Sequence, residues 1–321
     1  MAVYFLNLKT FGRSGGSSAV SAAAYRSGER IRDERTGRTY DHTDRQDVLH
    51  KEVVVPSRFG ETEMSWAKDR AYLWNAAENA ESRRNARVAR EYLVALPVEL
   101  DTEQRVQLAR GFSQELSDRY QFAVDLAVHE PRRYPGSDPR NFHAHLLATT
   151  REVTLSGLAA KTTLEMNDSR RRELGLEPAI HELLYVRERW ATVTNQALRE
   201  AHIEARVDHR SLRAQGIDRE PYPHIPRAAF EMERHGYQSV VGERMRAEYE
   251  ARVQARELAR EQARAREPQN QPRSHPVNLE EIRRQAREEW LRSRNVSAEP
   301  SAAAGAKSSD LDRSKDDSLS L

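Results

Sequence analysis

Short stretches in which apolar and polar residues alternate are separated by longer stretches of helical periodicity over the first half of the chain. Alternation with a period of two is typical of half-buried strands, whereas apolar residues every three or four positions are typical of amphipathic helices. The charged segment 31–50 is expected to form a short hairpin. The pattern predicts strands at residues 3–9, 51–56, 91–97, 122–129 and 142–149, and helices at 18–31, 65–87 and 102–120. This order predicts an α+β fold, with a mostly antiparallel central sheet that is covered by helices on one face.

The second half of the chain becomes increasingly charged. A short helix is expected at about 161–174 and a long amphipathic helix at 180–203, followed by a turn and one helical turn within 207–217. Two later segments, 242–266 and 279–294, are rich in Arg and Glu with few large apolar residues, which is typical of solvated helices. We therefore expect a folded domain over residues 1–236, a charged helical extension over 237–295 with a Pro-rich break near 268–276, and a disordered tail over 296–321.

Composition narrows the class of protein further. The chain has 321 residues, of which 38% are hydrophobic and 32% charged, and its net charge is only +2. A nucleic-acid partner would therefore have to be bound by local basic patches and not by a global field. The absence of cysteine excludes disulfides and thiolate chemistry. The start, MAVYFLNLKT, is unlike a signal peptide, and no run approaches the ~18 apolar residues of a membrane span, so a cytoplasmic protein without membrane insertion is expected.

Two histidines lie two residues apart in the apolar run FHAHLLATT at 142–150. In a strand His143 and His145 share one face, and His129 ends the preceding apolar run FAVDLAVH. If these two segments pair as antiparallel neighbours, the three imidazoles converge on one side of the sheet. Three imidazoles and an open side suit a divalent metal that also binds substrate. The alternative is that one or two of them are ordinary polar residues on a solvent-facing strand.

A tyrosine near the N-terminus is the candidate nucleophile. Tyr25 lies in a predicted helix that follows a Gly/Ser loop at 12–18, with three alanines before it and Arg26 and Arg30 after it. Small neighbours leave the ring uncovered, and the arginines would favour a phosphate or phenolate beside it. The alternative is a tyrosine that packs on the core with its hydroxyl in water. A metal that polarises a scissile phosphate would allow the tyrosine hydroxyl to attack it, which gives a 5′-phosphotyrosyl bond that conserves the energy for rejoining.

The candidate tyrosine and histidines, together with the segments around them, resemble those of the MobA/MobL plasmid mobilisation relaxases of the MobQ type, which are members of the HUH group of single-strand endonucleases. The resemblance is carried by several segments in the same order over roughly residues 1–236: MAVYFLNLKTFGRSGGSSAVSAAAYR, NARVAREYLVALPVEL, H-x13-HAHLLATTRE, RWATVTNQALREAHIEARVDHRSLRAQGI and FEMERHG. It implies a DNA relaxase that nicks one strand at a plasmid origin of transfer (oriT). Larger members continue into helicase or primase modules, whereas residues 237–321 contain no Walker-type GxxxxGK[ST] motif.

The resemblance also implies roles for particular residues. Tyr25 occupies the position of the transesterifying tyrosine, and His129, His143 and His145 occupy those of the metal ligands, with Mg²⁺ or Mn²⁺ expected. Single-stranded DNA at oriT is the implied partner, together with accessory relaxosome proteins and a coupling protein.

A carboxylate is also expected to orient a histidine or accept the tyrosine proton. Glu81 and Glu91 are both candidates, and Glu91 is preferred because it opens a predicted strand beside the histidines. Asp125 is a further candidate, because it shares a strand face with His129, and Asp208 is expected to cap a turn. Four residues are candidates for contacts with DNA: Arg13, Arg26, His209 and Arg210.

Two other functions fit the same residues. The histidines could support attack by water, as in a metal-dependent phosphodiesterase, which would turn over repeatedly and form no protein–DNA adduct. Alternatively, the chain could be a non-catalytic DNA-binding or plasmid-control protein that clamps hairpin DNA. Such a protein would bind equally well in EDTA.

Overall fold

The computed structural model describes residues 2–16, 18–60, 62–132, 137–266 and 279–295. The chain divides into two compact units, Met1–Arg219 and Glu220–Leu321. The first unit contains the sheet and the histidines, and the second contains helices only within its described residues. The predicted linker at 268–276 and the predicted tail at 296–321 lie outside the described residues.

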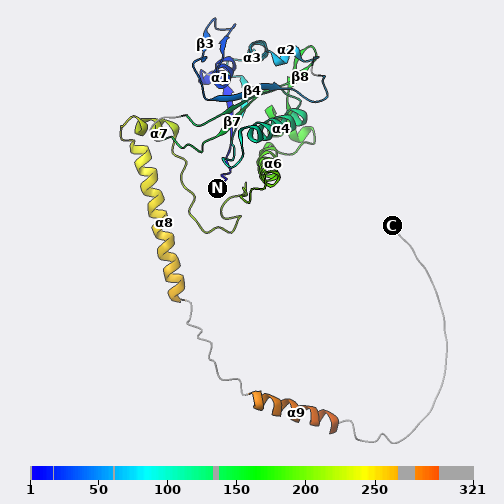
Figure 1. Ribbon diagram of the computed structural model, residues 1–321, viewed down its shortest axis with the longest axis vertical. Coiled ribbons are helices and arrows are strands. Elements are labelled where there is room, and N and C mark those ends of the chain that lie inside the picture. Colours follow the sequence, from blue (N-terminus) through cyan, green and yellow to red (C-terminus); the bar gives the residue numbers. More distant parts are fainter. Residues whose placement is uncertain (1, 17, 61, 133–136, 267–278, 296–321) are drawn as a thin grey trace, which may run out of the picture. The chain divides into compact units, whose positions relative to one another are not determined.

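A five-stranded sheet forms the centre of the first unit, and all of its neighbouring strands pair antiparallel (Figure 1). The strands in spatial order are β1 (Leu6–Gly12), β5 (Arg87–Ala95), β7 (His143–Thr149), β6 (Val124–His129) and β4 (Val48–Val54). The predicted α+β fold with a mostly antiparallel sheet is confirmed. Three strands are displaced from the prediction: β1 begins three residues later than expected, β4 three residues earlier and β5 four residues earlier.

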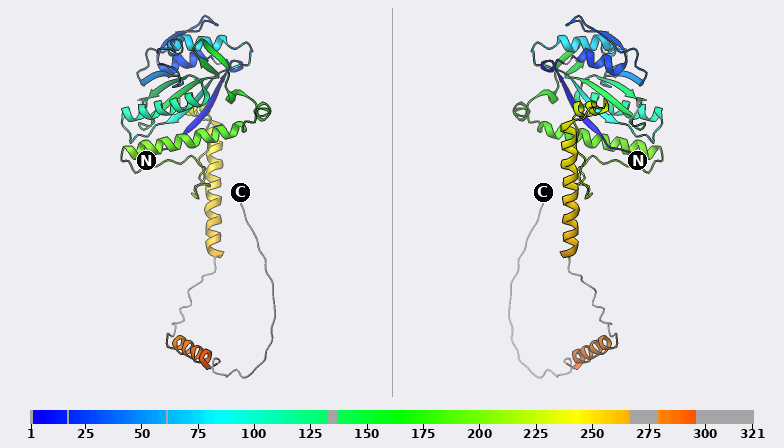
Figure 2. Two further views of the ribbon diagram at one scale, coloured as in Figure 1. Left: turned by 90° about the vertical axis from the view of Figure 1, so that its right-hand side faces the viewer. Right: turned by 90° about the vertical axis from the view of Figure 1, so that its left-hand side faces the viewer.

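One face of the sheet packs against two amphipathic helices, α4 (Thr102–Tyr120) and α6 (Ala179–Glu200) (Figure 2). Alternate residues of β7, Ala144, Leu146 and Ala148, enter this core, as the period of two predicts. Phe112 of α4 and Trp190 of α6 are both buried, with ring centroids 4.9 Å apart. A capping box at Asp101 fixes the start of α4 at the predicted residue.

The opposite face, which carries the histidines, is also covered by helices (Figure 1). The alanine-rich helix α1 (Ala19–Ser27) and helix α3 (Arg70–Asn79) pack over the sheet, and Leu73 and Trp74 of α3 are fully buried there. The expectation that helices cover one face only is therefore wrong. The short side chains of α1 allow this helix to pack closely against the sheet, so it covers part of the face that carries the histidines.

Smaller elements complete the first unit. The predicted hairpin at 31–50 is present as β2 (Arg30–Arg32) and β3 (Thr39–Asp41). The single helix predicted at 65–87 is instead α2 (Ser65–Lys68) and α3, because the Asp69 carboxylate caps a new helix start. A hairpin of β8 (Arg151–Thr154) and β9 (Gly157–Lys161) was not expected from the sequence, and it leads into α5 (Asp168–Glu173). The single helical turn predicted within 207–217 is present: the backbone N–H of Gln215 donates to the carbonyl of Ser211 at 3.0 Å, and Gly216 follows with a φ of 72°.

The second unit contains α7 (Arg227–Arg234), α8 (Val240–Arg266) and α9 (Leu279–Asn295). Most described side chains of α8 are exposed, and Arg244 pairs with Glu248 one turn later, as expected for a solvated helix. Across the described ranges, no helix is both long enough and apolar enough to cross a membrane.

Candidate active site

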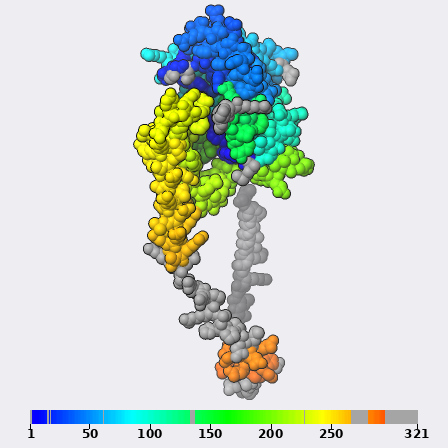
Figure 3. All heavy atoms as spheres, turned by 60° about the vertical axis from the view of Figure 1, so that its left-hand side comes forward, coloured from blue at the N-terminus to red at the C-terminus, as the bar shows by residue number. Residues whose placement is uncertain are grey.

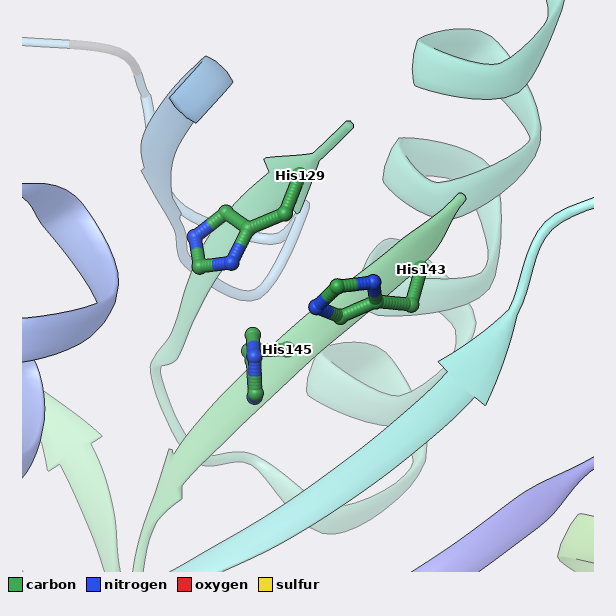
Figure 4. A group of neighbouring side chains, drawn as sticks. All are labelled: His129, His143 and His145. Atoms are coloured by element: carbon green, nitrogen blue, oxygen red, sulfur yellow. The ribbon is translucent and has the colours of Figure 1, made fainter. Parts of the chain in front are cut away.

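The pairing of β6 with β7 brings the three histidines together on one face. His129 is the last residue of β6 and lies opposite His143, the first residue of β7, and His145 follows two residues later on the same face. Their ring centroids lie 4.8–5.3 Å apart, and one ring nitrogen from each lies within 4.8 Å of the others (Figure 4). His129 is fully buried, whereas the other two are half-buried.

Hydrogen bonds to backbone carbonyls fix which nitrogen carries the proton in two of these rings. Nε2 of His129 lies 2.7 Å from the carbonyl oxygen of Arg26, and Nδ1 of His143 lies 2.9 Å from that of Asn141. A carbonyl only accepts, so each of these nitrogens must be the donor. The other nitrogen of each ring is then unprotonated: Nδ1 of His129 accepts a hydrogen bond from Nη2 of Arg45 at 3.3 Å, and Nε2 of His143 keeps its lone pair.

The third ring is oriented by a carboxylate. Nδ1 of His145 donates to Oε1 of Glu91 at 2.6 Å, which leaves its Nε2 unprotonated. The same Glu91 oxygen accepts a hydrogen bond of 2.5 Å from Nε of Arg26. Glu91 is 4% exposed, and it faces the histidines because its Cα partner in β7 is Leu147, which shares a face with His145. The structure thus brings together the residue that the sequence favoured and the histidine it was expected to orient.

Burial keeps the imidazoles neutral. Desolvation, together with repulsion from His145, lowers the pKa of His129 to about 3. Desolvation also lowers the pKa of His145 to about 4, although Glu91 opposes this shift, and it lowers the pKa of His143. Burial would raise the pKa of Glu91, but hydrogen bonds from His145 and Arg26 outweigh this and lower it to about 2. At neutral pH the site is therefore three neutral imidazoles beside an ionised carboxylate, which is the protonation state that metal binding requires.

Helix α1 presents Tyr25 beside this group. The side chain of Ser18 accepts a hydrogen bond from the backbone N–H of Ser21 at the start of the helix, and Gly28 ends the helix with a φ of 63°, a conformation that favours glycine. Arg26 ties the last turn to the sheet through its carbonyl and its guanidinium. Tyr25 is 38% exposed, which fits a ring open to solvent and not one packed in the core.

Residues that the sequence interpretation did not single out surround Tyr25. The ring of His42 meets it edge-on at a centroid distance of 5.3 Å, and the guanidinium carbon of Arg45 lies 4.3 Å from its ring centroid. Nη2 of Arg132 lies 3.5 Å from its hydroxyl oxygen. His42 and Arg45 were missed because segment 31–50 reads only as a charged hairpin, and Arg132 because it lies in the loop between the two histidine strands, where no periodicity indicates a direction. A possible signal is the closely spaced Arg45 and Asp47 just before a strand.

Other predicted site residues have different partners. Glu81 is bound by Arg151 at 2.8 Å and Lys161 at 3.2 Å, so it anchors the β8–β9 hairpin and does not join the histidines. Asp125 is bound by Arg70 and by the indole N–H of Trp74, and it therefore links α3 to the sheet without contacting His129.

The candidate DNA contacts differ in availability. Arg13 is bound to Glu78 and to the carbonyl of Glu81, and Arg26 is bound to Glu91, so both guanidiniums already have partners within the fold. His209 is half-buried and Arg210 is exposed, and Arg210 pairs with Asp208. The Asp208 carboxylate accepts the backbone N–H of Arg210, as expected for a residue that caps a turn.

An apolar cavity of about 480 Å³ lies beside the histidines. It is lined by His143 and His145 and by residues of the N-terminal segment, β5 and the loop before β7, including Val3, Phe5, Leu93 and Phe142. Val3 and Phe5 are 63% and 42% exposed, so large apolar side chains beside the cavity are open to solvent. In the space-filling view, the blue N-terminal residues pack beside the green residues of the central strands, within the first unit (Figure 3).

Comparison with known proteins identifies the family. The MobA/MobL family matches residues 17–235, which is more than half of the chain, and the chain belongs to this family. A mobilization protein MobL of Acidithiobacillus ferridurans is 37% identical over 253 residues, which cover 73% of this chain and 64% of that protein. A probable mobilization protein MobA of Bifidobacterium longum is 33% identical over 78% of this chain and 47% of that protein. This chain therefore spans less than two thirds of the length of these relatives.

A solved structure from a study of vancomycin resistance transfer in Staphylococcus aureus shares 28% identity with this chain and matches it with a TM-score of 0.52. The match covers 65% of this chain and all of that one. The fold found here is therefore also present in an experimentally determined structure.

Proposed function

We propose that this protein is a relaxase that nicks one strand of DNA at an origin of transfer by tyrosine transesterification. The hydroxyl oxygen of Tyr25 attacks the scissile phosphorus, the Tyr25 Oη–P bond forms, and the bond from phosphorus to the 3′ oxygen breaks. The products are a 5′-phosphotyrosyl adduct and a free 3′ hydroxyl, and the reverse transfer rejoins the strand. The observation that carries this proposal is the group of three histidines, each with one ring nitrogen within 4.8 Å of the others, beside the helix turn that carries Tyr25.

The donor set fits a divalent metal. Each of the three neutral imidazoles has one unprotonated nitrogen, which is the kind of atom that a divalent cation binds, and the rings lie close enough for one nitrogen of each to reach a common ion. His129, His143 and His145 would hold the ion, and Mg²⁺ or Mn²⁺ is proposed. When bound, the ion would polarise the scissile phosphate as a Lewis acid.

The surrounding residues have supporting roles in this proposal. Glu91 holds His145 in its ligating orientation and, through Arg26, keeps the end of α1 against the sheet. The exposure of Tyr25 lets a flexible single strand reach its hydroxyl. Curated relatives are called mobilization and conjugal transfer proteins, which supports DNA at oriT as substrate and accessory relaxosome proteins and a coupling protein as partners.

The test is to capture the covalent product. A pool of end-labelled single-stranded oligonucleotides of randomised sequence is incubated with the full chain and Mn²⁺ or EDTA, and the products are separated on a denaturing gel. The proposal predicts a metal-dependent band of retarded mobility that is lost in Tyr25→Phe. It is retained in Tyr72→Phe, which alters a tyrosine of α3 that is 60% exposed.

The other outcomes of this experiment point to the two alternative functions. Cleaved DNA without a retarded band would indicate a hydrolase that uses water. DNA binding of equal affinity in EDTA and Mn²⁺, without cleavage or adduct, would indicate a binding protein. A retarded band that persists in Tyr25→Phe would refute the role of this tyrosine.

A further inference from the structure

One carboxylate holds two arginines against the candidate nucleophile. Asp47 is bound by Arg45 through two hydrogen bonds, from Nε at 2.8 Å and from Nη2 at 2.5 Å. Nε of Arg132 binds the same carboxylate at 2.8 Å. The side chains of Asp47 and Arg45 are 11% and 7% exposed, so this arrangement is built into the fold, whereas Arg132 is 47% exposed and faces solvent.

Strand pairing brings these residues together. Asp47 directly precedes β4 and Arg132 follows β6, and the two strands pair with Val48 opposite His129. The carbonyl of Asp47 also accepts the backbone N–H of Glu130 at 2.9 Å, which extends the pairing beyond the strands. The two arginines are therefore fixed relative to His129.

Both arginines contact Tyr25, but at different atoms. Arg45 donates to the backbone carbonyl of Tyr25 and stacks on its ring, with the guanidinium carbon 4.3 Å from the ring centroid. Arg132 places Nη2 3.5 Å from the hydroxyl oxygen. Arg45 thus holds the position of the ring, whereas Arg132 lies at the atom that would react.

The nature of the hydroxyl's partner has a chemical consequence. Among the described residues, the side chain bound to the Tyr25 hydroxyl is Arg132, which is a donor and cannot accept a proton. The carboxylate of Glu91 already accepts from His145 and Arg26. A fixed positive charge at the hydroxyl instead favours the phenolate that forms as the oxygen attacks.

We propose that Arg132 is a catalytic residue that activates Tyr25 electrostatically, and that Asp47 and Arg45 are its positioning residues. This inference rests on the proposed transesterase function. As the Tyr25 Oη–P bond forms and the bond from phosphorus to the 3′ oxygen breaks, the phenolic proton passes to solvent water, and the departing 3′ oxygen takes a proton from water. Arg132 first stabilises the phenolate and then a non-bridging oxygen of the phosphotyrosyl product.

The test compares the rate of adduct formation with DNA affinity. Arg132→Ala is expected to slow single-turnover adduct formation roughly 100-fold, as for other donors at a developing charge. Its affinity for the same oligonucleotide in EDTA, measured by fluorescence anisotropy, should change by less than about threefold, the scale of one exposed ion pair. Arg170→Ala removes an arginine that is 59% exposed and paired with Glu173, and it should leave both quantities unchanged.

Two further variants separate a charge effect from a structural one. Arg132→Lys should regain part of the lost rate, and added guanidinium should partly rescue Arg132→Ala but not Arg170→Ala. Asp47→Asn should slow adduct formation, and its effect should be smaller in the Arg132→Ala background than alone, because only the part that acts through Arg45 remains there. Mn²⁺ affinity should be unchanged in Arg132→Ala.

The outcomes distinguish this inference from the proposed function. An Arg132→Ala protein that forms the Tyr25 adduct at the parent rate would overturn the inference and leave the transesterase intact. So would a slow variant that neither lysine nor guanidinium improves. Adduct formation that survives in Tyr25→Phe would instead overturn the proposed function itself.

Discussion

Replacing Glu91 with glutamine tests the carboxylate that links the nucleophile helix to the histidines. The substitution keeps the shape of the side chain but removes the charge that accepts hydrogen bonds from Arg26 and His145. Both donors converge on Oε1, where the amide oxygen of glutamine can remain, but a neutral acceptor makes weaker hydrogen bonds to both of them than a carboxylate does. The substitution also removes the negative charge that holds the His145 ring in its orientation.

The structure sets two magnitudes for this change. Glu91 and Arg26 are 5% and 11% exposed at their side chains, and breaking a buried pair of this kind costs about 3 kcal/mol of folding free energy. Loss of the carboxylate behind a metal-binding histidine lowers metal affinity by about 10- to 100-fold, or about 1.4–2.7 kcal/mol. We therefore expect Glu91→Gln to lower both stability and Mn²⁺ affinity.

Glu165→Gln is the matched control. Glu165 is a buried carboxylate, 2% exposed at its side chain, and it is bound by Arg90 at 2.7 Å, but it has no part in the histidine group. Its substitution should reduce the free energy of unfolding in urea by a similar amount while Mn²⁺ affinity, measured by calorimetry, stays at the parent value. The reasoning fails if Glu91→Gln binds Mn²⁺ as tightly as the parent, or if both variants lose affinity equally.

Three other predictions follow from buried groups. Asp125→Asn should lower the free energy of unfolding in urea by about 3 kcal/mol, because it breaks a buried pair with Arg70, and it should leave Mn²⁺ affinity unchanged. A large loss of Mn²⁺ affinity would contradict the structural role assigned to Asp125. Trp190→Ala should cost about 3–5 kcal/mol through lost packing, and a thermal midpoint near the parent value would argue against that core. Metal-free protein should lose stability as the pH falls below about 6.5, because the folded pKa values of His129 and His145, about 3 and about 4, lie below the ordinary value of 6.5. The contribution of these histidines to stability is complete above pH 6.5 and is lost as the pH falls toward the folded values. A free energy of unfolding in urea that rises on acidification would contradict this.

The sheet and its histidines could be predicted because strand periodicity is strict. A period of two places His143 and His145 on one face whatever surrounds them, and one antiparallel pairing adds His129. The same rule places Glu91 on the histidine face once β5 is paired with β7. By contrast, Glu81 lies in a loop, where no periodicity constrains its direction.

The features that were missed depend on tertiary contacts. Helix α1 carries mostly small residues, so its sequence does not reveal which face of the sheet it covers. The two strands of the hairpin at 151–161 have only four and five residues and lack a strict alternation of apolar and polar positions, so the strand signal is weak. Asp47 and Arg132 are 85 residues apart in the chain and meet only because β4 pairs with β6.

The most direct test of the central claim is to identify the amino acid that carries DNA after the reaction. Protein trapped with single-stranded DNA in Mn²⁺ is digested with protease and nuclease, and the peptides are sequenced by mass spectrometry. The account predicts a nucleotide joined through its 5′ phosphate to Tyr25, on the peptide that follows the Gly/Ser loop. A nucleotide on any other residue, or cleaved DNA with a free 5′ phosphate and an unmodified Tyr25, would contradict it.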